Sequence, residues 1–452
     1  MSKLLKTIIA LFLFATLNGY SQSLEKQFDG LLKQEYPENG TGVSALVAID
    51  GEIVYHKSFG KANLEWNVDV DNTTKFEIGS ITKQFTAVAI LMLAEQGKLN
   101  IDDNITEYFE DYPTHGHTIK ISHLLSHTSG LASFTAYDDW YDNRYNDISQ
   151  EEFMAMFKKT PMLFAPGEKY YYSNTGYFLL GMLVEKLSGQ TYAEFINQHI
   201  FKKLGMKNST FLSRHEIITS RATGHVKVDD KLIKSDEFLY GHAFSAGAII
   251  STTYDLFLWN RAIKNNVLIS EASKRNAFAN TGLSNGKYAN YGYGWAINEV
   301  NEVPSIEHNG GTFGFFSNAI YLPNPDIFVV ALSNCVCSAT DFVSTKMAAI
   351  AANRPYIELS DKDVEINVEF ADKIVGTYEF EDGSKRIISF ENNTLYSQVP
   401  NNGKSKLYPI GPQTFQIKDS FAQFIFNHDQ KGTPSLLFKN RIRKTRGTKT
   451  AN

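Results

Sequence analysis

Cysteine is scarce in this chain of 452 residues, which contains only Cys335 and Cys337. Both lie in the apolar run IFVVALSNCVC, which predicts a strand and its exit. A bond between residues two apart in a strand would strain the disulfide geometry. No further Cys or His lies nearby to complete a metal site. We therefore predict two buried or half-buried free thiols, no disulfide and no bound metal.

An excess of charge of one sign is also lacking. The formal net charge is −5, with 21% charged and 43% hydrophobic residues, values ordinary for a soluble globular protein. This balance argues against nucleic acid as the main partner. The expected partner is a small-molecule or peptide substrate, and no cofactor is predicted. The sequence carries no signal for an oligomeric state.

Long apolar runs are absent beyond the N-terminal region. Residues 1–21 contain two lysines, an apolar run from Thr7 to Leu17, and small residues at Gly19 and Ser21. This pattern is typical of a cleaved signal peptide, and the run is too short for a stable membrane span. A buried N-terminal helix is the alternative. We predict an exported protein, periplasmic or secreted, whose formal charge goes from −5 to −7 when the two lysines are removed.

The order of the predicted elements indicates an α+β fold. Residues 43–60 predict a β-hairpin that turns at Asp50-Gly51. Apolar residues from Phe85 to Leu93 recur at helical spacing. Helical segments and loops fill residues 102–234, and strand-like runs return from about residue 289 to 336. Strands at both ends with helices between them predict an antiparallel sheet flanked by helices, together with a mostly helical subdomain.

A second region begins after Pro355. Short alternating runs between residues 368 and 442 predict a small antiparallel β-barrel or sandwich. The basic stretch 441–452 is predicted to be a disordered tail, with contact to an anionic surface as the alternative. The predicted organisation is a signal peptide over 1–21, a main domain over 22–355 and a small β-domain over 356–452.

The pattern Ser-x-x-Lys places a hydroxyl one helical turn from an amine that can take its proton. It occurs at Ser23, Ser58, Ser80 and Ser284. Only Ser80 begins a strongly apolar helix, where backbone N–H groups favour a developing negative charge. The alternative is that Ser80 caps the helix and that Lys83 is solvated. The Ser-x-x-Lys pattern alone does not distinguish a nucleophile at Ser80 from a helix cap, so other motifs of the chain are needed.

Two further patterns follow in order along the chain. Tyr172-Ser173-Asn174 precedes an amphipathic segment. A Tyr hydroxyl can act as a base beside a cation such as Lys83, and an Asn amide can hold a substrate amide. His308-Asn309-Gly310-Gly311 contains the only His-x-Gly of the chain. Its glycines allow a strand edge to approach a substrate closely and to offer N–H donors.

This ordered set resembles the serine hydrolase family that includes class C β-lactamases, penicillin-binding carboxypeptidases, D-amino-acid peptidases and related esterases. The flanking stretches FEIGSITKQFTAVAI, HLLSHTSGL, PGEKYYYSNTGY and HNGGTFGF are similar to that family as well. The resemblance covers about residues 42–334. The C-terminal region resembles the small lipocalin-like β-domains often joined to members of this family.

The resemblance implies an acyl-enzyme formed on Ser80. It assigns proton transfer to Lys83 and Tyr172, and leaves open which of the two is the base. The remaining implied residues contact the substrate or the developing oxyanion: Asn174 orients the substrate, His308 and Gly310 border it, and the N–H groups of Ser80 and Gly311 form the oxyanion hole. His123 and His127 lie in a predicted helix and are expected to serve packing.

Lys-Thr-Gly, the third motif of dedicated β-lactamases, is absent from this chain. His308 occupies its place, so a group mostly neutral at pH 7 replaces a permanent cation. An esterase or a D-amino-acid peptidase is therefore expected rather than a true β-lactamase. One alternative is a catalytically silent binding or sensor protein with the same fold. Another is a ligand carrier whose work is done by the C-terminal β-domain.

Overall fold

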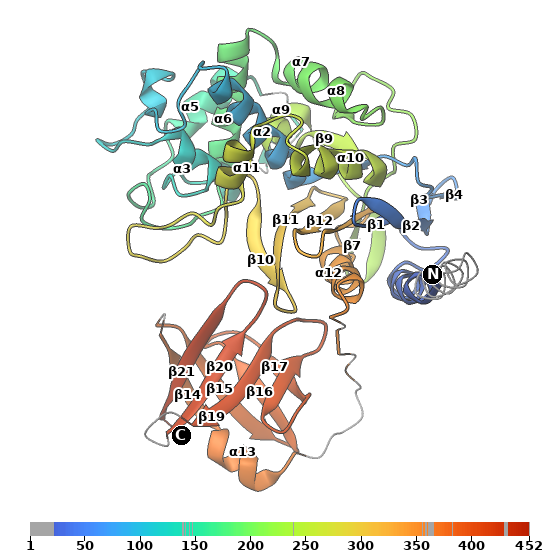
Figure 1. Ribbon diagram of the computed structural model, residues 1–452, viewed down its shortest axis with the longest axis vertical. Helices are drawn as coiled ribbons and strands as arrows, with labels where there is room; N and C mark the ends of the chain where they lie inside the picture. The colour runs from blue at the N-terminus through green and yellow to red at the C-terminus, as the bar shows by residue number, and fades with distance from the viewer. Residues whose placement is uncertain are drawn as a thin grey trace, which may run out of the picture. The chain divides into compact units, whose positions relative to one another are not determined.

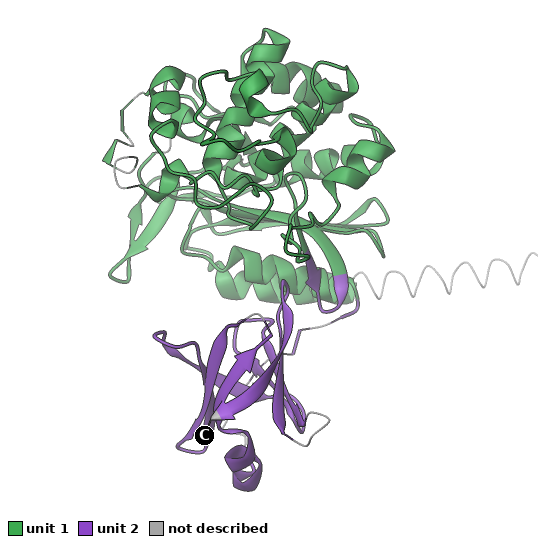
Figure 2. Cartoon of the chain, turned by 90° about the vertical axis from the view of Figure 1, so that its left-hand side faces the viewer, with its two compact units in different colours: residues 1–297, 304–352 green, residues 298–303, 353–452 purple. Residues whose placement is uncertain are grey.

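The computed structural model describes residues 22–452 except 138, 139, 141, 144, 147, 238, 355, 358, 360–365, 382, 429–432 and 452. The predicted signal peptide lies outside the described residues and stays a prediction. The chain forms two compact units, unit 1 with residues 1–297 and 304–352, and unit 2 with residues 298–303 and 353–452 (Figure 2). None of the described helices has the length and hydrophobicity that crossing a membrane requires.

Unit 1 is built on a six-stranded sheet with the order β10-β11-β12-β13-β1-β2. The hairpin of β1 and β2 turns at Asp50-Gly51 as predicted, and β1 then pairs antiparallel with β13 from the far end of the unit. This pairing confirms the prediction of one sheet made from distant segments. The strands are β1 (Val43–Ile49), β2 (Glu52–Phe59), β10 (Ala296–Val300), β11 (Val303–Gly311), β12 (Phe316–Leu322) and β13 (Ile327–Ser333).

Helices cover both faces of this sheet (Figure 1). Successive side chains of a strand point to opposite faces, and β12 shows both environments. Ala319 and Tyr321 line the core beneath α10 (Thr253–Lys264). Asn318 instead donates from Nδ2 to Ser344 Oγ at 2.8 Å, on α12 (Thr340–Ala351). The sheet is therefore the middle layer of unit 1.

The helical part of unit 1 lies between β2 and β10 in sequence. Its central helix, α2 (Thr82–Glu95), is buried from Thr82 to Leu93 and packs against α6 (Asn174–Ser188) and α9 (Tyr240–Gly247). The other helical elements are η1 (Gly79–Ile81), η2 (Ile105–Glu107), α3 (Ile121–Leu125), η3 (Phe134–Ala136), α5 (Gln150–Phe157), α7 (Tyr192–Ile196), η4 (Asn197–Phe201), α8 (Lys202–Leu204) and α11 (Glu271–Ala277). Three small sheets complete the unit: β3 (Lys61–Asn63) with β4 (Val68–Asp69), β5 (Phe76–Glu77) with β9 (Ile249–Ser251) and β6 (Thr210–Phe211), and β7 (His225–Val228) with β8 (Lys231–Lys234).

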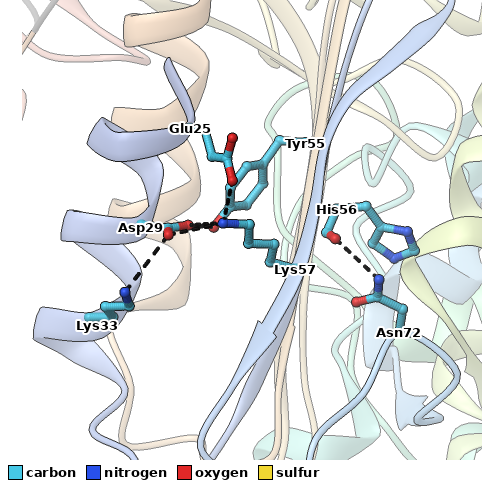
Figure 3. A network of polar contacts seen from close by, with 7 residues as sticks. All are labelled: Glu25, Asp29, Lys33, Tyr55, His56, Lys57 and Asn72. Atoms are coloured by element: carbon cyan, nitrogen blue, oxygen red, sulfur yellow. Dashed lines mark hydrogen bonds and ion pairs between the residues drawn. The ribbon is translucent and has the colours of Figure 1, made fainter. Parts of the chain in front are cut away.

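A helix over residues 22–35 is joined to β2 by a polar network. Lys57 Nζ lies 2.6 Å from Glu25 Oε1 and 3.0 Å from Asp29 Oδ2 (Figure 3). The Tyr55 hydroxyl donates to Asp29 Oδ1 at 2.8 Å. Ion pairs at partly exposed positions stabilise only weakly, so this network mainly fixes where the first described segment lies on the sheet.

Unit 2 is a closed eight-stranded antiparallel barrel, as predicted for the C-terminal region. Its interior is filled by large side chains such as Tyr378, Phe424 and Phe438, as is usual for an eight-stranded barrel. The elements are α13 (Val368–Ile374), β14 (Gly376–Phe380), β15 (Lys385–Glu391), β16 (Thr394–Gln398), β17 (Lys404–Pro409), β18 (Thr414–Ile417), β19 (Gln423–His428), β20 (Pro434–Lys439) and β21 (Lys444–Ala451).

The predicted disordered tail is wrong. β21 (Lys444–Ala451) pairs with β20 on one side and with β14 on the other, and so closes the barrel. Thr445 and Gly447 are buried, whereas Lys444 and Arg446 are exposed. The basic residues therefore alternate with small inward-facing residues, with the period of two of a strand. The high charge of the stretch concealed this alternation.

The prediction of free thiols is also wrong, because the structure joins Cys335 and Cys337 in a disulfide. β13 ends at Ser333, and Cys337 lies in the turn that follows. The two Cα atoms are 5.0 Å apart, within the range that a disulfide bridges. The prediction failed because it extended the strand past Ser333.

Candidate active site

Ser80 lies in η1, one turn of 3-10 helix directly before α2. Gly79 has a φ of +50°, and a Cβ atom there would lie 2.9 Å from the backbone N and O of Gly311. Only glycine fits this close approach without strain. The turn places Ser80 Oγ 3.0 Å from Lys83 Nζ. Ser80 and Lys83 therefore form a hydrogen-bonded pair at the start of the apolar helix.

Lys83 is fully buried behind Ser80. Its Nζ donates to the Ala246 carbonyl oxygen at 2.8 Å and lies 4.8 Å from the centre of the Tyr172 ring. Burial lowers the pKa of Lys83 well below its usual value. A buried amine of this kind is neutral in a larger fraction near pH 7 and can accept a proton.

The acceptor for Lys83 comes from a break in α9, which sequence reasoning missed. Phe244 has a φ of 36° and a ψ of −132°, outside helical values. The following carbonyls turn away from the helix: Ser245 O accepts from Thr86 Oγ1 at 2.6 Å, and Ala246 O accepts from Lys83 Nζ at 2.8 Å. A backbone carbonyl leaves no mark in the side chains. The only sequence signal for this contact was therefore the stretch FSAGAIIS at residues 244–251.

Tyr172 lies in the segment that leads into α6. Its hydroxyl is buried and interacts with the side chain of Ser80. Burial raises the pKa of Tyr172, and the nearby Ser80 hydroxyl opposes this shift. Asn174 begins α6 and donates from Nδ2 to Thr135 Oγ1 at 3.0 Å. Tyr172 therefore lies beside Lys83, and the side chain of Asn174, two residues further on, is oriented by Thr135.

His308 is buried on β11 and contacts Tyr291, a residue that the sequence did not reveal. The distance from His308 Nε2 to the Tyr291 hydroxyl is 2.7 Å, and Nδ1 lies 2.5 Å from the Asn309 carbonyl oxygen. A carbonyl only accepts, so we assign the ring proton to Nδ1 and the acceptor role to Nε2. Burial, together with the nearby Lys83 charge, lowers the pKa of His308 to about 3.

Gly310 and Gly311 bring β11 against the nucleophile turn. A Cβ on Gly310 would lie 2.0 Å from Ile78 O and 2.8 Å from Ser80 N. Gly311 is exposed, and β10 is shorter than β11, with 5 against 9 residues, so it leaves this end of β11 uncovered. The backbone of Gly310-Gly311 thus lies against Gly79-Ser80. The two N–H groups expected to form the oxyanion hole, those of Ser80 and Gly311, therefore lie on adjacent backbone segments.

Of the two histidines expected to pack in a helix, only His123 lies in α3. His127 follows the end of α3, has a φ of 58° and is buried. Its ring centre lies 4.2 Å from that of Tyr172. The prediction of a helical position is therefore wrong for His127, because the helix ends at Leu125. No group of three or more His, Cys, Asp or Glu side chains suited to a metal ion occurs among the described residues.

Comparison with known proteins agrees with this fold. The Beta-lactamase family model matches residues 30–354. Penicillin-binding protein 4* of Bacillus subtilis is 30% identical over 431 residues, which cover 90% of this chain and 94% of that protein. The solved structure of the octameric penicillin-binding protein homologue from Pyrococcus abyssi has a TM-score of 0.67 at 23% identity and covers 93% of this chain and 99% of that one. That of D-amino acid amidase from Ochrobactrum anthropi has a TM-score of 0.64 at 23% identity and covers 72% and 99%.

These two structures share the fold of this chain. Fold and site together define a serine hydrolase of the β-lactamase type. The chain belongs to the Beta-lactamase family, which confirms the resemblance predicted from the three motifs.

Proposed function

We propose that the protein hydrolyses esters or D-amino-acid amides and peptides through an acyl-enzyme on Ser80. The observation that carries the proposal is the pair formed by Ser80 Oγ and the buried Lys83 Nζ, 3.0 Å apart. A serine hydroxyl hydrogen-bonded to a buried amine is one form of an activated nucleophile, because the amine can take the hydroxyl proton.

Burial shifts the two proton-handling residues in opposite directions. It lowers the pKa of Lys83, which favours the neutral amine. It raises the pKa of Tyr172, which keeps the phenol protonated. A base must be free to accept a proton, and an acid must hold one. We therefore assign the base to Lys83 and proton donation to Tyr172.

In the proposed acylation, Lys83 Nζ takes the Ser80 proton while Oγ attacks the acyl carbon. The negative charge on the acyl oxygen is held by the N–H groups of Ser80 and Gly311. Collapse of this intermediate breaks the bond to the leaving group, which receives a proton from Tyr172, and Tyr172 recovers one from Lys83. Water then releases the acyl group by the same steps in reverse.

The proposed substrate class rests on His308. Its imidazole is neutral over the working pH range and bonded to Tyr291, so the third motif supplies no fixed cation for a substrate carboxylate. The structural similarity to a D-amino acid amidase supports an amide substrate. We therefore expect faster turnover of short esters and D-aminoacyl amides than of benzylpenicillin.

We propose in addition that the protein acts outside the cytoplasm. The N-terminal pattern of residues 1–21 and the Cys335–Cys337 disulfide both support this, because disulfides persist mainly in oxidising compartments. N-terminal sequencing of the protein from its native cell should give a mature chain that begins near residue 22. An intact Met1 on protein from the cell envelope would contradict a cleaved signal.

The test is covalent labelling by a fluorophosphonate probe, combined with a panel of ester, D-aminoacyl amide, D-Ala-D-Ala and cephalosporin substrates. We expect one probe adduct on Ser80, and its loss together with hydrolysis in Ser80→Ala. Ser284→Ala is the matched control, because Ser284 also begins a Ser-x-x-Lys pattern but is exposed in a loop. No turnover of any substrate by a folded wild-type protein would favour a silent binding protein.

A further inference from the structure

His127 holds the residues on both sides of Tyr172. Its carbonyl oxygen accepts from the Tyr171 N–H at 2.9 Å. Its ring Nδ1 accepts from the Ser173 N–H at 3.0 Å. The imidazole also lies against the Tyr172 ring, with 4.2 Å between the ring centres. One residue therefore fixes the backbone before and after Tyr172 and supports its ring.

The protonation state of His127 follows from these contacts. A backbone N–H only donates, so the Nδ1 that accepts from Ser173 carries no proton, and Nε2 carries the ring proton. His127 is only 1% exposed, and its Nε2 has no hydrogen-bond partner in the described part of the chain. Burial lowers the pKa of His127 well below its usual value. The neutral ring keeps its acceptor over the working pH range.

These contacts help to set the position of Tyr172. Apart from Ser80 itself, the Tyr172 hydroxyl has no hydrogen-bond partner among the described residues. Its location is therefore set by the backbone of the segment and by ring packing. An error of about 1 Å in a catalytic group can reduce a rate by roughly 100-fold.

We infer that His127 is a positioning residue, which sets the place of Tyr172 by accepting hydrogen bonds from the residues on either side of it. This inference rests on the proposed function, in which Tyr172 transfers a proton at Ser80. It goes beyond the packing role expected from the sequence, because packing needs the shape of the ring but not its acceptor nitrogen.

Two substitutions separate shape from hydrogen bonding. His127→Phe keeps a flat ring against Tyr172 but has no acceptor for the Ser173 N–H. His127→Asn loses the ring but places Oδ1 the same number of bonds from Cα as Nδ1, and Asn tolerates a positive φ better than most residues. His123→Phe is the matched control, because His123 Nδ1 also accepts a backbone N–H, from Lys120 at 3.2 Å, and lies outside the site.

The experiment measures kcat and KM for a p-nitrophenyl ester, together with the rate of fluorophosphonate labelling. We expect His127→Phe to lower kcat by roughly 10- to 100-fold with little change in KM. His127→Asn should recover most of that loss, and His123→Phe should behave like the wild type. Wild-type kcat in His127→Phe, or a loss in His127→Asn as large as in His127→Phe, would overturn the inference.

The wild-type protein supplies a test that needs no variant to fold. In protein labelled with ¹⁵N-histidine, the chemical shifts of His127 should show a proton on Nε2 and none on Nδ1 between pH 5.5 and 8. A proton on Nδ1 would overturn the inference, because the Ser173 N–H could not then donate to it. Activity retained in Ser80→Ala would instead defeat the proposed function, so the two failures are distinguishable.

Discussion

The imidazole of His308 is bonded to the Tyr291 hydroxyl, with 2.7 Å between Nε2 and the phenol oxygen. The other ring nitrogen, Nδ1, is bonded to the Asn309 carbonyl oxygen, so both ring nitrogens of His308 already have partners. Burial holds the pKa of His308 at about 3, far below the ordinary value near 6.5. An affinity for carboxylates that rises as pH falls through 6.5 is therefore not expected here.

The first prediction compares two esters that differ only by a free carboxylate beside the scissile bond. Because His308 stays neutral above about pH 5, the ratio of their KM values should change by less than about twofold between pH 5.5 and 8. His308→Gln, which has no titrating ring, should show the same flat ratio. A ratio that moves in favour of the carboxylate below pH 6.5 in the wild type but not in His308→Gln would contradict this prediction.

The second prediction concerns acid stability. The pKa of His308 is lower in the folded state, about 3, than in the unfolded chain, about 6.5. Between these values the unfolded state binds more protons, so stability is fully present above pH 6.5 and is lost as pH falls. From pH 7.5 to 5.0 this group should cost about 2 kcal/mol of unfolding free energy.

Urea unfolding at the two pH values measures this loss. The four tryptophans, Trp66, Trp140, Trp259 and Trp295, all lie in unit 1, so their fluorescence reports the unit that contains His308. His308→Gln should lose less stability over this pH interval than the wild type. His115→Gln, at an exposed position, is the control and should lose as much as the wild type.

The third prediction concerns Lys83 and Tyr172. Each of Lys83→Ala and Tyr172→Phe should slow acylation by roughly 10²- to 10⁴-fold, the range of acid–base catalysis. Because both residues handle the same proton, the double variant should be little slower than the worse single variant. Stopped-flow acylation rates give the comparison, and additive losses would show that the two residues act in separate steps.

The pH dependence tests which residue is the base. If neutral Lys83 accepts the proton, kcat/KM rises with pH through the lowered pKa of Lys83 and then levels off. Lys83→Arg, which cannot deprotonate, should remain inactive at every pH. If the activity of Lys83→Arg approached that of the wild type at any pH, Lys83 would not be the base, and the base would be Tyr172.

Much of the site could be predicted because its parts lie in local motifs. Ser80 and Lys83 are one helical turn apart, and the apolar helix that follows reveals their place. The glycines at 310 and 311 predict a strand edge that comes close to another segment of the chain. The hairpin at Asp50-Gly51 and the small barrel were visible for the same reason, since short-range patterns set them.

The missed features depend on contacts between distant segments. His127 and Ser173 are 46 positions apart in sequence, and the Ala246 carbonyl is 163 positions from Lys83. No local pattern marks either contact. The disulfide and the last strand were missed for other reasons. The predicted strand was extended past its true end at Ser333, and the high charge of the stretch that begins at Lys444 concealed its alternation.

The last prediction concerns a chain without residues 353–452, the barrel part of unit 2. All the residues of the candidate site lie in unit 1, and the barrel closes on itself through its own eight strands. A chain that ends after Ala352 should therefore keep Ser80 labelling and ester hydrolysis at rates close to those of the full chain. Tryptophan fluorescence during urea unfolding checks that unit 1 is folded in this truncated protein, because unit 2 contains no tryptophan.

The truncation also removes partners of the turn at residues 298–303. In the full chain, Glu299 N–H donates to the Arg441 carbonyl oxygen at 3.0 Å, and Glu302 pairs with Lys439 at 2.7 Å. Glu302→Ala in the full chain is the matched control, because it removes the ion pair and leaves the barrel in place. If the truncated protein unfolds like the wild type but fails to react with the probe while Glu302→Ala reacts normally, unit 2 is required for the chemistry at Ser80, and the assignment of the complete site to unit 1 is wrong.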